Sequence, residues 1–221
     1  MENLIIYGNG KIAKIVYHFV KESFNVIAFT VDKILIKHKK IEGLSVLPFE
    51  NIENEYSSID HKMLIAVGYV EMNNIREKKY LEARHKGFRF VNYIHPSVHI
   101  HDTTELGENN IILDNVSLQP YSLIGNSNFV WSNAVIAHGA NIGDTNWITS
   151  GVVVSGDAKV KSNCFLGVNA TIGHNAMLED ETFIGANTLV TKDTNKGDVF
   201  ISKPGEYFRL DSQRFLQFAK V

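Results

Sequence analysis

An aliphatic residue recurs at every sixth position through the second half of this 221-residue chain. The unbroken register comprises Ile94, Ile100, Leu106, Ile112, Leu118, Ile124, Val130, Ile136, Ile142, Ile148, Val154, Val160, Leu166, Ile172, Leu178, Ile184 and Val190. Small residues recur four places later, at Thr104, Ser122, Ala134, Ala140, Cys164, Ala170 and Thr188. A period of six fits neither a helix nor a long alternating strand. It fits short strands that turn a corner after each repeat and bury these side chains, so the sequence predicts a parallel β-helix.

The same period predicts how the coils stack. If three repeats make one triangular turn, residues eighteen apart lie above one another, and the register spans roughly five coils. His95 and Pro96 mark the start of the coils, because the fixed φ and missing N–H of proline suit a corner better than a paired strand. We assign residues 93–200 to this all-β domain and residues 201–221 to a C-terminal tail, with a short terminal helix.

The first 92 residues alternate short apolar runs with amphipathic segments. We expect strands at residues 4–7, 25–31 and 62–67, and helices at residues 12–21 and 73–86. The first helix is expected to present one apolar face, formed by Ile12, Ile15, Val16, Phe19 and Val20. Gly87 is placed to end the second helix. Alternating strands and helices indicate a small α/β, Rossmann-like domain over residues 1–92.

A glycine turn, Gly8-Asn9-Gly10-Lys11, joins the first strand to the first helix. Free backbone N–H groups at a helix N-terminus suit a phosphate. The full G-x-G-x-x-G fingerprint is absent, so a plain tight turn is the competing interpretation. Asp32 ends the second expected strand, where a carboxylate can accept hydrogen bonds from a ribose or a base, although a capping or solvent-facing role fits equally well.

Composition excludes several kinds of partner. The formal net charge is −2, so we expect no nucleic-acid partner. The start of the chain has no basic leader and no apolar stretch long enough for a bilayer, so we expect a cytoplasmic protein without a membrane partner. Cys164 is the single cysteine, and His99 and His101 lack a third ligand, so we predict no disulfide and no metal site.

The chain resembles the hexapeptide-repeat sugar acetyltransferases of the PglD type and the sialic-acid O-acetyltransferase-like proteins. The resemblance covers nearly the whole length. Its carriers are Ile6-Tyr7-Gly8, the strand reaching Asp32, Ile65-Ala66-Val67-Gly68, Ile94-His95-Pro96-Ser97, Ala137-His138 and Ile142-Gly143-Asp144. The resemblance implies a left-handed β-helix, an exception to the right-handed crossover rule. It also implies a homotrimer that binds acetyl-CoA between neighbouring coils.

The implied reaction is acetyl transfer from acetyl-CoA to the amine of a UDP- or dTDP-linked amino-deoxy sugar, in surface glycan biosynthesis. The N-terminal domain would hold the nucleotide sugar, through Gly8, Asn9, Gly10, Lys11, Asp32 and Gly68. Acetyl-CoA would contact Trp147, Gly156, His174 and Lys192. The alternatives are a sugar O-acetyltransferase and a non-catalytic, nucleotide-sugar-binding β-helix.

His138 aligns with the family's catalytic histidine and is the expected general base, since an imidazole accepts a proton near neutral pH. The chain departs from the family at two positions nearby. Gly139 replaces the usual Asp or Glu, and by the eighteen-residue rule Asp157 is the candidate for a displaced carboxylate that orients the ring. Trp147 replaces a second histidine, and an indole can pack on pantetheine but cannot exchange protons.

Overall fold

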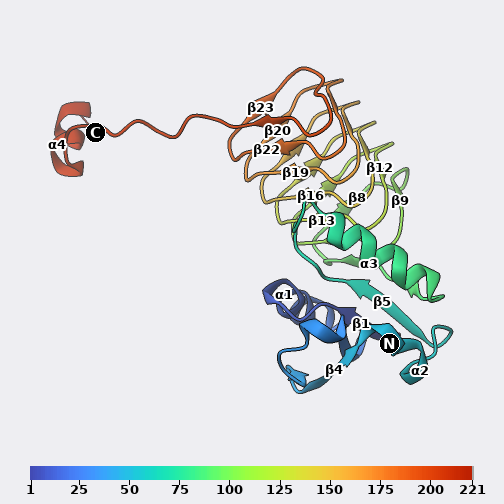
Figure 1. Cartoon of the computed structure of the whole chain (residues 1–221). Coiled ribbons are helices and arrows are strands. Elements are labelled where there is room, and N and C mark those ends of the chain that lie inside the picture. The colour runs from blue at the N-terminus through green and yellow to red at the C-terminus, as the bar shows by residue number, and fades with distance from the viewer. Residues whose placement is uncertain (221) are drawn as a thin grey trace.

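The computed structural model describes residues 1–220, which form a six-stranded sheet followed by a column of stacked short strands (Figure 1). The strands of the first sheet are β1 (Asn3–Tyr7), β2 (Asn25–Val31), β3 (Lys40–Ile41), β4 (Leu44–Pro48), β5 (His61–Ile65) and β6 (Arg89–Phe90). Their order is β3-β4-β2-β1-β5-β6, and only β3 and β4 pair antiparallel. The helices are α1 (Lys11–Val20), α2 (Ile52–Glu55) and α3 (Asn74–His85), with 3-10 turns at η1 (Lys33–Leu35) and η2 (Phe49–Asn51).

The expected strands and helices of this region are present, with ends shifted by one or two residues. β1 is buried on both faces because its run Leu4–Ile6 is wholly aliphatic. Helix α1 packs on the core through Ala13, Val16 and Val20, whereas Ile15, expected on the buried face, is 37% exposed. The β3–β4 hairpin was not expected, because its strands are short and Pro48 ends the second one.

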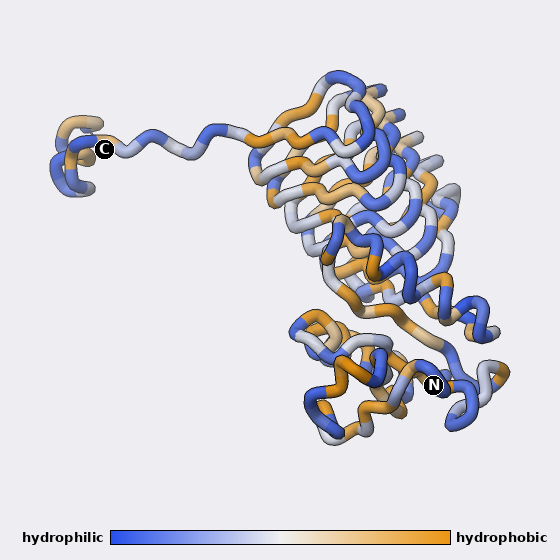
Figure 2. The backbone as a smooth tube through the Cα atoms, viewed as in Figure 1, coloured by the Kyte–Doolittle hydropathy of each residue, from blue (hydrophilic) through white to orange (hydrophobic). Residues whose placement is uncertain are grey.

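The second half of the chain is a parallel β-helix, as the six-residue period predicts. Its strands are β7 (Tyr93–Ile94), β8 (His99–Ile100), β9 (Glu105–Leu106), β10 (Ile111–Ile112), β11 (Ser117–Leu118), β12 (Leu123–Ile124), β13 (Phe129–Val130), β14 (Val135–Ile136), β15 (Asn141–Ile142), β16 (Trp147–Ile148), β17 (Val153–Val154), β18 (Lys159–Val160), β19 (Phe165–Leu166), β20 (Thr171–Ile172), β21 (Met177–Leu178), β22 (Phe183–Ile184), β23 (Leu189–Val190) and β24 (Val199–Phe200). They form three parallel sheets. Figure 2 shows hydrophobic and hydrophilic segments alternating along the coils.

The pairing register confirms the predicted stacking. From β7 to β20, each strand pairs with the strand eighteen residues further along, for example Val135 with Val153 and Val153 with Thr171. The second residue of each strand points inward and is buried along most of the column. Ile100 is the most exposed of them, at 39%, and Ile94, Leu106 and Phe200 are half-buried, because β7, β8, β9 and β24 are edge strands.

Every sixth residue from Asn109 to Asn187 has a positive φ, between 54° and 72°. These residues stand at the corners of the coils, three places after the buried aliphatic residue. Asparagine and glycine tolerate this left-handed conformation better than other residues. Gly139 is one of these corner residues, and so is Asp157 in the next coil. A glycine at position 139 therefore satisfies a backbone requirement of the β-helix.

A column of asparagines runs inside the first coils. Each side-chain oxygen accepts a hydrogen bond from the backbone N–H eighteen residues further on, with N···O distances of 2.8 to 2.9 Å. The asparagines are Asn92, Asn110, Asn128 and Asn146, and the last donor is the N–H of Cys164. This ladder supplies acceptors for N–H groups that the corners would otherwise leave unpaired.

A buried arginine of α3 joins the N-terminal sheet to the β-helix. Arg76 is 1% exposed and donates to the carbonyl oxygens of Val67, Ser127, Thr145 and Asn146, at 2.9 to 3.3 Å. Burial lowers the pKa of its guanidinium to about 9. Because these carbonyls belong to both halves of the chain, the single side chain fixes one half against the other.

The chain ends in the expected short helix, α4 (Ser212–Ala219). Its N-cap is Asp211, whose carboxylate accepts the backbone N–H of Arg214 at 2.9 Å. An extended segment separates α4 from the β-helix (Figure 1), and Phe215 and Phe218 are exposed.

Candidate functional site

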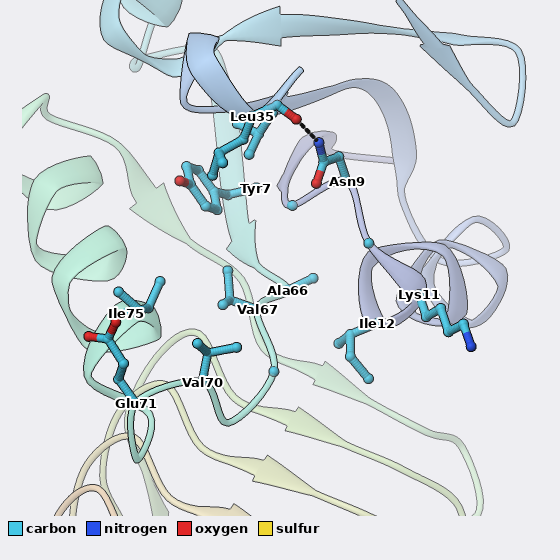
Figure 3. Close-up of a pocket in the computed structure, with 14 residues that line it drawn as sticks. Tyr7, Asn9, Lys11, Ile12, Leu35, Ala66, Val67, Val70, Glu71 and Ile75 are labelled. Carbon is cyan, nitrogen blue, oxygen red and sulfur yellow. Dashed lines mark hydrogen bonds between the residues drawn. The ribbon is translucent and has the colours of Figure 1, made fainter. Parts of the chain in front are cut away.

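A cavity of about 470 Å³ lies beside the glycine turn that precedes α1 (Figure 3). Its walls come from the end of β1, the first residues of α1, the segment that follows β5 and the start of α3. Five of the six residues expected to hold the nucleotide sugar line it, namely Gly8, Asn9, Gly10, Lys11 and Gly68. The structure therefore gathers residues far apart in sequence around one hollow of ligand size.

The glycine turn brings the backbone close to the neighbouring strand. Gly8 has a φ of +136°, and a Cβ there would lie 2.7 Å from the carbonyl oxygen of Ala66. Only glycine fits this position. Gly10 is different, because no atom lies within 4 Å of the place where its Cβ would stand. Asn9 fixes the turn from the other side by donating from Nδ2 to the carbonyl oxygen of Leu35 at 2.6 Å (Figure 3).

The electrostatics of this turn favour an anion. Helix α1 begins at Lys11 with no acidic residue in its first turn, and its N-cap Gly10 offers no side-chain acceptor. A neighbouring hollow shares Asn9, Gly10 and Lys11 and is also lined by Lys14, Lys37 and His38. The positive end of the helix dipole and these basic side chains act in the same direction.

Asp32 lies outside the main cavity, in an adjacent hollow. Its Oδ1 accepts from the hydroxyl of Tyr7 at 3.0 Å and pairs with Nζ of Lys79 at 2.8 Å. Burial, and then the charge of Asp32, raise the pKa of Tyr7 well above its ordinary value. Burial opposes the charge of Lys79, but its contacts with Asp32 and Glu82 outweigh burial and raise its pKa. The Asp32 carboxylate thus already has two partners within the chain.

A second group of expected site residues lies along one corner of the β-helix. His138, Gly156, His174 and Lys192 are eighteen residues apart and each follows a strand of the sheet β14-β17-β20-β23 by two residues. A Cβ at Gly156 would lie 2.6 Å from Nε2 of His138, so the imidazole rests directly over the Gly156 backbone. On the next coil, Nδ1 of His174 lies 2.7 Å from the carbonyl oxygen of Gly156. Both rings lean toward the same glycine.

Asp157 stands at this corner, next to Gly156. Its backbone N–H donates to the carbonyl oxygen of His138 at 3.0 Å. Its carboxylate lies in the space that a side chain at Gly139 would occupy, with Oδ2 4.0 Å from Nδ1 of His174. Within residues 1–220, no hydrogen bond joins this carboxylate to the His138 ring.

Trp147 lies on a different face of the β-helix from His138, in β16. It is 3% exposed and packs against Tyr69 and Phe129, with the Arg76 guanidinium carbon 5.4 Å from its ring centroid. Its indole belongs to the core between the two halves of the chain. Almost none of the surface of this side chain is free, so the structure leaves little of the indole for the expected contact with pantetheine.

Sequence reasoning missed Arg76, Lys79 and the asparagine ladder. The ladder carries a readable signal, the eighteen-residue spacing of four asparagines. Arg76 and Lys79 lie in a helix that is charged all round, so no pattern marks the buried face. Within residues 1–220, no three His, Cys, Asp or Glu side chains are grouped in a way that would hold a metal ion, and no helix is long and apolar enough to cross a membrane.

No protein-family model matches the chain, and no curated protein sequence matches it either. Solved structures do. The acetyltransferase domain of PglB from Neisseria gonorrhoeae is 20% identical with a TM-score of 0.82, over 94% of this chain and 100% of that one. PerB from Caulobacter crescentus, solved with CoA and GDP-perosamine, is 23% identical with a TM-score of 0.79, over 91% and 95% of the two chains.

WeeI from Acinetobacter baumannii is 17% identical with a TM-score of 0.54, over 92% of this chain and 98% of that one. At these identities the likeness is one of fold. The chain therefore has the fold of the hexapeptide-repeat sugar acetyltransferases over both halves. It covers 100% of the PglB domain and 95% of PerB. Two further structures of the PerB enzyme are variants in which one histidine is replaced by alanine or by asparagine.

Proposed function

We propose that this protein transfers the acetyl group of acetyl-CoA to the amine of a nucleotide-linked amino-deoxy sugar. The observation that carries this function is the likeness to PerB over both halves of the chain, since PerB was solved with CoA and a nucleotide-linked amino sugar. The product would be an activated, N-acetylated sugar donor of the kind that surface glycan assembly consumes.

The two halves divide the work. Residues 1–92, which we take as a Rossmann-like domain, hold the nucleotide sugar in the cavity beside Gly8 and Gly10. The diphosphate lies at the N-terminus of α1, where Lys11 adds positive charge. Tyr7 and Lys79 hold Asp32 at the edge of this site, where it faces the adjacent hollow.

Residues 93–200, which we take as a left-handed β-helix, carry the chemistry. The protein assembles as a homotrimer, and acetyl-CoA lies between neighbouring β-helices, along the corner that bears Gly156, His174 and Lys192. Residues 201–221 are the C-terminal tail, which contains α4. An exposed ammonium at Lys192 suits a phosphate of CoA, and the neighbouring imidazoles suit the thioester.

His138 acts as the general base. The sugar amine attacks the carbonyl carbon of the thioester, the C–N bond forms, and the C–S bond breaks to release CoA. The amine proton passes to the imidazole of His138, an effect typically worth about 10² to 10⁴-fold in rate. Backbone N–H groups at the corner stabilise the oxyanion that forms on the carbonyl oxygen.

The test is the release of CoA thiol by the purified protein with acetyl-CoA and a panel of UDP-, dTDP- and GDP-linked amino sugars. Wild type and His138→Ala are compared, with His99→Ala as a matched exposed-histidine control on the first coil. Release with one amino sugar, largely lost only in His138→Ala, supports the proposed function and identifies the substrate. Activity that survives in His138→Ala keeps the reaction but removes His138 from it.

Two other results would change the function itself. Release only with hydroxyl acceptors would make the protein an O-acetyltransferase. No release with any acceptor, together with binding of nucleotide sugars, would make it a binding protein. A thermal-shift titration with acetyl-CoA separates these two cases, because a ligand that binds only the folded state raises its melting temperature.

A further inference from the structure

The corner of the β-helix holds a second imidazole whose tautomer is set by the backbone. Nδ1 of His174 lies 2.7 Å from the carbonyl oxygen of Gly156. A carbonyl oxygen can only accept a hydrogen bond, so Nδ1 must carry the proton. The backbone N–H of Asn175 donates to the same oxygen at 3.2 Å, which uses its other lone pair. Nε2 is therefore the free nitrogen of the His174 ring.

A carboxylate faces the same nitrogen. Oδ2 of Asp157 lies 4.0 Å from Nδ1 of His174, so two consecutive residues, Gly156 and Asp157, supply a carbonyl oxygen and a carboxylate to one edge of the ring. Both oxygens lie on the Nδ1 side of the ring, the side on which a carboxylate orients the histidine in catalytic triads. The other charged or titratable groups of this column are Asp102, His138 and Lys192, and Asp193 follows Lys192 in the chain.

The two histidines form one site and not two. They are thirty-six residues apart, which is two coils, so their backbones are separated by about 10 Å at the usual strand spacing. The rings close much of that gap, because His138 rests over Gly156 and His174 bonds to its carbonyl oxygen. His174 is the ring nearer to Lys192, and therefore lies on the side proposed for the CoA phosphates.

We propose that His174 is the proton donor to the departing CoA sulfur, with Gly156 and Asp157 as its positioning residues. This role rests on the proposed function. As the C–S bond breaks, the bonding electrons go to sulfur, and Nε2–H of the His174 imidazolium gives its proton to the thiolate. The amine proton goes separately to His138. His138 then loses its proton to water and His174 takes one from water, so the site returns to its starting state with no net change.

The experiment compares kcat and the KM for acetyl-CoA in wild type, His174→Gln and the exposed control His99→Gln. Glutamine keeps an N–H donor for the Gly156 carbonyl but cannot transfer a proton. We expect kcat to fall about 100-fold or more in His174→Gln, within the range for loss of acid–base catalysis, with KM within twofold of wild type. An unchanged kcat, or a raised KM alone, overturns the inference and leaves His174 as a binding residue.

A second measurement does not depend on turnover. Nitrogen-15 NMR of histidine-labelled wild type, with His174→Gln to assign the signal, reports which ring nitrogen carries the proton. We expect Nδ1–H at a pH where the ring is neutral, and the Nε2–H tautomer would overturn the inference. If wild type releases no CoA with any acceptor, the proposed function fails and the role of His174 falls with it. If wild type and His174→Gln are both fully active, the role of His174 is wrong while the proposed function stands.

Discussion

The carboxylate of Asp157 lies in the space into which a side chain at Gly139 would project. Both residues stand at left-handed corners, one coil apart, with φ values of 58° and 67°. The absence of a side chain at position 139 therefore has two effects: it relieves backbone strain, and it makes room for a carboxylate that faces His174 at 4.0 Å. A carboxylate from the next coil therefore occupies the place of a side chain at position 139.

This pair can be tested by substitution. Gly139→Ala should lower the free energy of unfolding by about 1 to 2 kcal/mol, because an L-residue is strained at a positive φ. It should also displace the Asp157 carboxylate. In Gly139→Ala/Asp157→Gly the clash is gone, so the loss of stability should be smaller than in the single variant. Denaturant unfolding of the three proteins measures this, and equal losses in the single and double variants would show that the two side-chain positions do not compete.

A substitution at Gly156 should impair catalysis without lowering stability. Its φ is not in the left-handed region, so Gly156→Ala adds no such backbone strain, but the new methyl group would lie 2.6 Å from Nε2 of His138 and push the ring aside. We expect kcat to fall at least about tenfold through misplacement of the base. The free energy of unfolding should change by less than about 1 kcal/mol, since the His138 side chain is exposed. Gly205→Ala, in open space in the tail, is the control, and full activity in Gly156→Ala would contradict the geometry of this corner.

The glycine turn offers a matched pair of substitutions. Gly8→Ala combines a φ of +136° with a contact of 2.7 Å to the Ala66 carbonyl oxygen, and should destabilise the protein by roughly 2 kcal/mol or more. Gly10→Ala has open space around it and should cost no more than about 1 kcal/mol, as expected for a helix N-cap. Thermal unfolding of the two variants checks this ranking, and the reverse order would show that the turn is not held against β5.

Most of the β-helix can be predicted from the six-residue period of the sequence. Six-residue spacing predicts the strands, eighteen-residue spacing predicts the register, and together they place His138, Gly156, His174 and Lys192 in one column. This works because each coil contacts only its neighbours, so local pattern determines the structure. The spacing says which side chains face outward but does not fix their rotamers, which is why the approach of Asp157 to His174 could not be foreseen.

Contacts between the two halves lay beyond sequence reasoning. Trp147 occupies an outward position of its repeat, which predicts exposure, yet the N-terminal half covers it. Arg76 sits in a helix without a clear apolar face. Both positions depend on how two separate folding patterns dock, and no period within either pattern contains that information.

Tyr7 should make stability fall at high pH. Burial, and then the charge of Asp32, raise its pKa above the ordinary value of about 10. Above that pH the unfolded chain loses the phenol proton while the folded chain keeps it, so the folded state binds more protons and the free energy of unfolding decreases as pH rises. Unfolding measured between pH 8 and 11 should show this decline, and it should be shallower in Tyr7→Phe. The stability of Tyr121→Phe, at an exposed corner, should decline as steeply with pH as that of wild type. An equally steep decline in Tyr7→Phe would show that the pKa of Tyr7 is not raised.

Arg76 should prove the strongest link between the N-terminal sheet and the β-helix. In Arg76→Met the carbonyl oxygens of Val67, Ser127 and Thr145 lose the donor that the buried guanidinium supplies. Each buried carbonyl left without a partner costs about 1 to 3 kcal/mol, and removal of a buried charge offsets part of the total, so we expect a loss of roughly 3 kcal/mol or more. Arg84→Met, on the exposed side of the same helix, should stay within about 0.5 kcal/mol of wild type. Denaturant unfolding followed by tryptophan fluorescence is suitable, because the Trp147 ring lies 5.4 Å from the guanidinium carbon and the second tryptophan, Trp131, lies 5.8 Å from Trp147. If Arg76→Met unfolds at the same denaturant concentration as Arg84→Met, the buried guanidinium contributes nothing measurable to holding the two halves together.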